Sequence, residues 1–167
     1  GNYNTALGAS SLYSNTSGAN NTALGYSALT SNTSGNYNTA LGASSLYSNE
    51  TGLNNTALGY SSLYSNETGF RNTAIGGYAL YSNTSGGLNI ALGSHALYNN
   101  TIGNGNIAIG INAGNLDASD GNLTQSANSI FLGGNTKAQS NEQANQIVIG
   151  VNAVGAGSNS VVLSNSF

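Results

Sequence analysis

The sequence predicts an all-β protein, a parallel β-solenoid built from 17-residue rungs. A short motif, NTALG or a close variant, recurs with a fixed 17-residue period, which is the signature of one structural unit stacked on itself. Gly, Asn, Ser and Thr dominate the composition, and only 4% of residues are charged. Apolar residues locked to the fixed period argue against a disordered tract. The seven copies begin at Asn4, Asn21, Asn38, Asn55, Asn72, Asn89 and Asn106.

Each repeat predicts two short strands and two turns. The NTALG segment is the first strand and Gly8 turns the chain. A second strand is expected around Ser10 to Tyr13, and a return turn runs from Ser14 to Gly18. Asn and Gly at the corners supply the left-handed backbone conformations that tight turns need. A helix is disfavoured because frequent Gly and poor helix formers fill the unit.

The repeats predict two regions of one solenoid, a regular one over 1–110 and an irregular continuation over 111–167. A 23-residue interval separates Ile107 from Ile130, which places an insertion near 115–127. The intervals that follow are shorter, a 17-residue one from Ile130 to Ile147 and a 14-residue one from Ile147 to Val161. Because the chain begins inside a repeat, we expect a fragment of a longer fibre.

The strand alternation predicts which side chains face the interior. Thr5 and Leu7 share one face of the first strand and Ala6 points to the other. We expect the Thr and Leu face to line the coil. The opposite face is also apolar, and a strand that is apolar on both faces is expected to be buried on both. We therefore predict a homo-oligomer whose chains pack along this second face, through Ala6, Ala23, Ala40, Ala57, Ala74, Ala91, Ala108, Phe131, Val148 and Val162.

The motifs NTALG, NIALG, NIAIG, SIFLG, IVIG and NSVVLS resemble the head repeats of trimeric autotransporter adhesins over essentially the whole chain. Similar repeats occur in trimeric tail fibres of phages and injection systems, and in fibre proteins of predatory bacteria. The resemblance implies a left-handed parallel β-roll that assembles as a homotrimer. It places Thr39 and Leu41 in the roll interior, Ala40 at the trimer contacts and Gly42 in the turn. It also implies an extracellular location, on a bacterial surface or on a virion or injection-system fibre.

A column of tyrosines is the main candidate for a ligand surface. It lies one position after the inward Leu12 column and should face outward. One interpretation is a stacked aromatic ladder that supports the sheet. The other is a surface for sugars or a partner protein, because Tyr has a broad apolar face and a polar tip. The column comprises Tyr13, Tyr47, Tyr64, Tyr81 and Tyr98, with Thr30 interrupting it.

The remaining polar residues predict structural roles and no enzyme. The column that begins with Asn15 is expected to form an amide ladder, and its sequons make glycosylation a minor alternative. Glu50 and Glu67 are expected at a solvated corner. Asp117 and Asp120 are expected to cap a turn, with ion binding as the weaker alternative. A lone His95 cannot build a metal site. We therefore expect no catalytic residue, no metal and no cofactor.

Composition also limits the partners. Arg71 and Lys137 are the only basic residues and the net charge is -3, so nucleic acid and anionic membranes are poor partners. No apolar run is long enough to insert into a membrane. The leading expectation is a structural and adhesive module of an extracellular fibre, which attaches to a host or prey cell. The first alternative is a carbohydrate- or receptor-binding head that uses the tyrosines or the insertion. The second is ice binding, which requires the Thr column to face outward; its replacement by Ile argues against that orientation.

Overall fold

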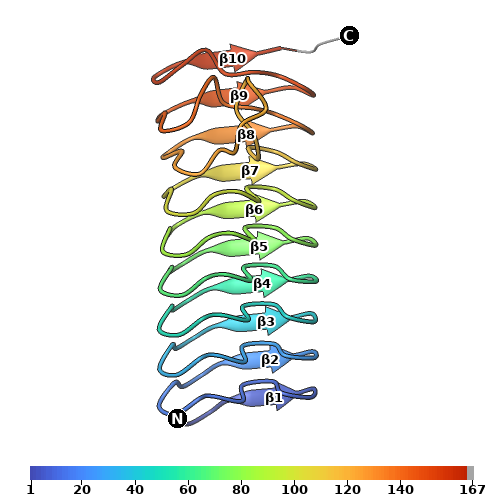
Figure 1. Cartoon of the computed structure of the whole chain (residues 1–167), viewed down its shortest axis with the longest axis vertical. Coiled ribbons are helices and arrows are strands. Elements are labelled where there is room, and N and C mark those ends of the chain that lie inside the picture. The colour runs from blue at the N-terminus through green and yellow to red at the C-terminus, as the bar shows by residue number, and fades with distance from the viewer. Residues whose placement is uncertain (165–167) are drawn as a thin grey trace.

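A computed structural model of the chain describes residues 1–164 and contains one parallel sheet of ten strands, stacked in chain order. Figure 1 shows the strands one above another, with each rung looping back to the next strand. The strands are β1 (Thr5–Leu7), β2 (Thr22–Leu24), β3 (Thr39–Leu41), β4 (Thr56–Leu58), β5 (Thr73–Ile75), β6 (Ile90–Leu92), β7 (Ile107–Ile109), β8 (Ile130–Leu132), β9 (Ile147–Ile149) and β10 (Val161–Leu163).

Equivalent residues of successive repeats pair directly, which turns the sequence repeat into columns of side chains. Thr5 pairs with Thr22, and the register continues through β10. Strands in a sheet lie about 4.8 Å apart, so ten of them form a stack about 45 Å long. The prediction of an all-β parallel solenoid with 17-residue rungs is confirmed.

The interior of the coil is the reverse of the predicted one. Ala40 and its equivalents are fully buried, whereas Leu41 is 39% exposed. The buried leucines come from the other wall, where Leu46 and its equivalents point inward. These leucines fill the thin interior, so the strand opposite them has room only for a small central side chain.

The prediction that the alanine column packs between chains is therefore wrong. Its inner members are enclosed within a single chain, and only the residues of the end rungs keep exposure. Fully buried are Ala23, Ala40, Ala57, Ala74, Ala91, Ala108, Phe131 and Val148, while Ala6 is exposed and Val162 half-buried. Thr39 and Leu41, expected inside, face outward.

The predicted turn at Gly8 is present, but the second strand around Ser10 to Tyr13 is not. Ser10 and Leu12 have positive φ angles of 59° and 51°, in the left-handed region that no strand can contain. The same angles recur in the other regular rungs. We call this part of each rung the return segment. Its backbone still bonds to the next rung, as when the Leu12 amide donates to the Ala28 carbonyl at 3.0 Å.

Two ladders of buried asparagine amides run along the coil. The one predicted from Asn15 is confirmed: Asn66 Nδ2 donates to Asn49 Oδ1 at 2.8 Å, and the same bond repeats from rung to rung. The second ladder uses the first residue of NTALG. The Asn55 backbone amide donates to Asn38 Oδ1 at 3.0 Å, and its Nδ2 donates to the Gly69 carbonyl at 2.8 Å. These amides satisfy the backbone at the corner where the chain enters each strand.

The sheet continues through the irregular region because one large side chain replaces another. Gly114 stands where the earlier rungs carry an inward leucine, and Phe131 of β8 takes the freed space. A Cβ added to Gly114 would lie 2.7 Å from Phe131 Cδ2, so the two residues fit as a pair. The insertion follows Gly114 directly, with Leu116 bridging antiparallel to Asn122 and Leu123 fully buried.

Candidate functional site: the outer sheet face, the tyrosine ladder and an asparagine groove

The outer face of the sheet is an exposed surface that carries many apolar side chains. We define the outer stripe as the first and third residues of each strand, which flank the buried central residue. Leu24, Leu41, Leu58 and Ile75 are each about 40% exposed, and the threonines of the first three strands are exposed beside them. The threonine column becomes isoleucine in β6 to β9 and valine in β10.

The outer stripe is long enough to be an interaction surface. Ten strands of three residues cover about 45 Å by 10 Å, on the order of 450 Å². Exposed aromatic side chains widen it at both edges, with Tyr26 and Tyr60 after the strands and Tyr37 and Phe70 before them. This area is similar to the largest apolar patch of a typical monomer, and such patches are often functional.

The tyrosines form the predicted stacked ladder on the opposite wall. Tyr47, Tyr64, Tyr81 and Tyr98 stack with centroid separations of 5.0 to 5.1 Å and interplanar angles of 4° to 12°. Tyr13 is separated from them by Thr30 and is 80% exposed. The stacked rings present mainly their edges and hydroxyl groups to solvent. Their use as a ligand surface remains a prediction.

Two further rings join the ladder in its upper part. Tyr78 stacks on His95 with centroids 5.0 Å apart, and both rings lie against Tyr98. Partial desolvation in this cluster raises the pKa of Tyr78 above 10.0, and the Tyr60 hydroxyl adds to the effect. Desolvation raises the pKa of Tyr81 in the same direction. The cluster favours neutral phenols.

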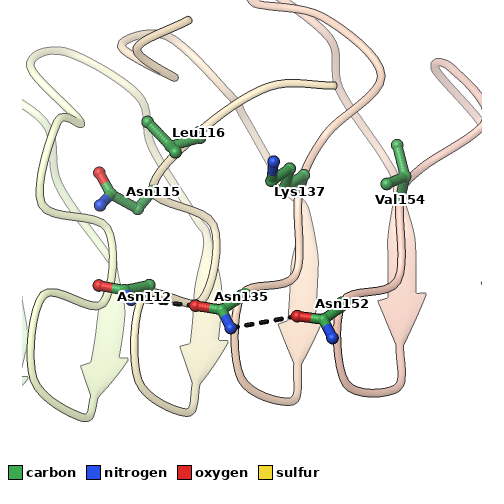
Figure 2. A pocket seen from close by; sticks show the side chains of 7 residues that line it. All are labelled: Asn112, Asn115, Leu116, Asn135, Lys137, Asn152 and Val154. Atoms are coloured by element: carbon green, nitrogen blue, oxygen red, sulfur yellow. Dashed lines mark hydrogen bonds between the residues drawn. The ribbon is translucent and has the colours of Figure 1, made fainter. Parts of the chain in front are cut away.

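A groove of about 530 Å³ opens next to this aromatic cluster. Figure 2 shows a row of three asparagines along one side, with Leu116, Lys137 and Val154 along the other. Asn112 Nδ2 donates to Asn135 Oδ1 at 3.0 Å, and Asn135 Nδ2 donates to Asn152 Oδ1 at 3.1 Å. We call this row the asparagine row.

Asp117 caps the turn of the insertion, and Lys137 forms an ion pair with the insertion. Asp117 Oδ1 accepts hydrogen bonds from the Ser119 hydroxyl at 2.8 Å and from the amides of Ser119 and Gly121 at 2.9 Å. These bonds lower the pKa of Asp117 below its ordinary value, so the loop holds a carboxylate. Lys137, which lines the groove, forms an ion pair with Asp120 of the insertion. The expected turn cap is confirmed for Asp117.

The other predicted polar residues are placed as follows. Glu50 and Glu67 are exposed at the corner, on successive rungs. Within the ladder predicted from Asn15, the sequon asparagines from Asn32 to Asn83 are fully buried, which blocks their glycosylation in the folded chain. Within residues 1–164, no group of three or more His, Cys, Asp or Glu side chains could hold a metal ion.

Sequence reasoning missed the groove and the second asparagine ladder. The irregular spacing after Gly110 hid the asparagine row, because its members follow one another at a 23-residue and then at a 17-residue interval. The available signal was local: Asn112, Asn135 and Asn152 each stand two positions after the glycine that ends a strand motif.

Comparison with known proteins adds no assignment to these surfaces. In the described part of the chain, the structure has no helix long and apolar enough to cross a membrane. Neither the protein-family models, nor the curated proteins, nor the solved structures contain a match to this chain.

Proposed function

We propose that this chain is a structural and adhesive module of an extracellular fibre, in which three copies pack side by side along their outer stripes. The observation that carries the proposal is the column of third residues in the outer stripe, in which a Leu or Ile stands on each of the ten strands. An isolated chain leaves this surface in water. A second and third copy would cover it and produce a rod whose length is set by the number of rungs.

The chemistry of the outer stripe suits packing between copies. On each strand it places a Thr, Ile or Val beside a Leu or Ile, as with Thr39 beside Leu41 or Ile107 beside Ile109. Burial of apolar surface contributes about 25 cal/mol per Å², so small gains per strand add up along the stack. Side chains aligned at the strand spacing can interdigitate with an identical column. The three-fold number, the left-handed coil and the location on a bacterial surface or a virion-type fibre come from the resemblance to adhesin head repeats and belong to the same proposal.

The mass of the protein in solution tests this proposal. We expect the parent to show three times the 16.7 kDa chain mass by light scattering and sedimentation. Leu41→Glu together with Leu58→Glu should give a monomer with an unchanged circular dichroism spectrum, because both side chains point outward. Thr33→Glu is the matched control, since its column already holds Glu50 and Glu67 at the exposed corner. A monomeric parent, or a trimer indifferent to both stripe substitutions, would contradict the packing.

Ice binding is a second candidate because the threonine column faces outward. Thr5, Thr22 and Thr39 are exposed and in register at the strand spacing of about 4.8 Å. A monomeric parent that shapes ice crystals, and loses this activity in Thr22→Leu with Thr39→Leu, would favour this function over the fibre.

A further inference from the structure

The asparagine row is the continuation of an aromatic column. Tyr78 and His95 occupy the same place in their rungs as the three asparagines do in the next three. Every one of these residues has a left-handed backbone, with φ between 54° and 60°. Each backbone amide bonds to the preceding rung in the same way, as from Asn135 to the Ile111 carbonyl at 2.8 Å. Five successive rungs therefore project one column of side chains, first rings and then carboxamides.

The carboxamides of the asparagine row are preorganised for binding a ligand. Asn112, Asn135 and Asn152 are fixed by their mutual hydrogen bonds, so little side-chain entropy remains to be lost on binding. A carboxamide has two N–H donors and two oxygen lone pairs, and each ladder bond uses one of them. Asn135 thus keeps one N–H and one lone pair beyond the row. Such a group can donate to one hydroxyl and accept from its neighbour.

The far side of the groove carries two apolar side chains. Leu116 and Val154 line it. Asn115, at the groove end nearest the aromatic cluster, is held by Asn99, whose Nδ2 donates to its Oδ1 at 2.6 Å. The ammonium of Lys137 is already paired with Asp120, so the groove presents no unpaired charge. A ligand with hydroxyl groups on its edges and C–H groups on its faces fits this lining, and an uncharged sugar has that character.

We propose that this groove binds an uncharged glycan, laid along the long axis of the coil with its hydroxyls on the asparagine row and an apolar sugar face on Leu116 and Val154. The groove volume of about 530 Å³ lies in the range of small-molecule sites. Successive rungs are about 4.8 Å apart, close to the length of one hexopyranose in an extended chain, so neighbouring sugar rings meet neighbouring amides. Beyond Asn112, His95 and Tyr98 are the next ring side chains along the coil, and their polar tips can hydrogen-bond to a further sugar.

This site is independent of the proposed fibre packing. None of the seven residues that line the groove belongs to the outer stripe, so glycan binding and oligomeric state can be measured separately (Figure 2). Failure of the trimer would leave the glycan proposal standing, and the converse also holds.

A glycan array with the full chain, followed by titration calorimetry with the best neutral oligosaccharide, tests the proposal. Asn135→Leu removes the central carboxamide and should weaken binding about tenfold, the effect of losing one or two hydrogen bonds. Leucine is acceptable at this backbone, since Leu97 has a φ of 51°. Asn145→Leu is the matched control, because Asn145 is also exposed, has a φ of 56° and donates to Asn159 at 3.0 Å outside the groove. It should keep the affinity within about twofold.

Three results would overturn the assignment. The first is no binding to any neutral glycan on the array. The second is equal affinity of Asn135→Leu and the parent, with matching thermal unfolding to show that both are folded. The third is binding restricted to acidic glycans and abolished by Lys137→Met, which would make the ammonium, and not the asparagine row, the recognition element.

Discussion

Replacing one buried asparagine of the ladder predicted from Asn15 should destabilise the solenoid strongly. Asn66 is fully buried and takes part in three hydrogen bonds. Its Nδ2 donates to Asn49 Oδ1 at 2.8 Å and to the Gly69 carbonyl at 3.2 Å, and its Oδ1 accepts from Asn83 Nδ2 at 2.8 Å. Asn66→Ala removes all three and leaves their partners buried without solvent.

The magnitude follows from the number and burial of these bonds. A net contribution of about 1 kcal/mol for each bond, with a further penalty of about 1 to 2 kcal/mol for the stranded groups, gives a loss of about 4 kcal/mol. A folded domain is typically stable by only roughly 10 kcal/mol, so this loss is a large share of the total. Asn15→Ala is the matched control, because Asn15 is half-buried in the end rung, and water can replace its bonds to Gly18 and Asn32. We expect it to cost about 1 kcal/mol.

Urea unfolding followed by circular dichroism measures the difference, and amide exchange locates it. Solenoid stability is a sum of nearest-neighbour terms, so exchange in Asn66→Ala should accelerate first in the rungs next to the substitution. Equal losses of stability in Asn66→Ala and Asn15→Ala would refute the argument that burial of the ladder governs its energy.

Three further tests probe other features. Tyr64→Ala removes stacking on both sides of a ring whose neighbours lie at 5.0 and 5.1 Å, and should lower the free energy of unfolding, measured by thermal unfolding, by about 2 kcal/mol. Tyr13→Ala, the control, should lower it by less than about 0.5 kcal/mol. Similar losses in the two variants would contradict a stabilising ladder. Gly76→Ala, with a φ of 131° and its new Cβ 2.6 Å from the next rung, should cost about 3 kcal/mol. The adjacent Gly77→Ala, with nothing closer than 4.0 Å, should stay within about 1 kcal/mol, and a reversed order would show that the rung spacing is not as described. Because the pKa of Asp117 is lowered in the folded protein, its carboxylate stabilises the loop fully above pH 3.8, and this stabilisation is lost as the pH falls through the folded-state pKa. Exchange of the loop amides should therefore accelerate only in that acidic range. In Asp117→Ala, loop exchange should show no pH dependence in that range beyond that of intrinsic exchange.

The sequence was sufficient for the repeat unit, the parallel register and the Asn15 ladder, since a fixed period puts like residues on top of each other. It misled on which strand face is inside. Leu7 and Leu12 were both assigned to the interior, although a coil this thin cannot hold two leucine columns. The return segment fills the space with Leu46 and its equivalents, and the strand then has room for Ala40 and its equivalents. The side-chain volumes on the two walls together decide which strand face points into the coil, and the alternation of side chains along one strand does not show this.

The candidate sites were predictable to different degrees. The tyrosine ladder could be anticipated because its members keep the 17-residue spacing. The groove could not, because it depends on how the insertion folds after Gly114 and on the left-handed backbone at Asn112 and Asn135. Those features arise from packing across rungs whose lengths differ.

The pairing of Gly114 with Phe131 defines the stacking register of the rungs. Near-identical rungs can stack one place out of step with little change in energy, since a threonine meets a threonine in either arrangement. A phenyl ring that needs the single vacancy above Leu97 admits only one arrangement. The irregular rungs thus determine which of the regular rungs stack on one another.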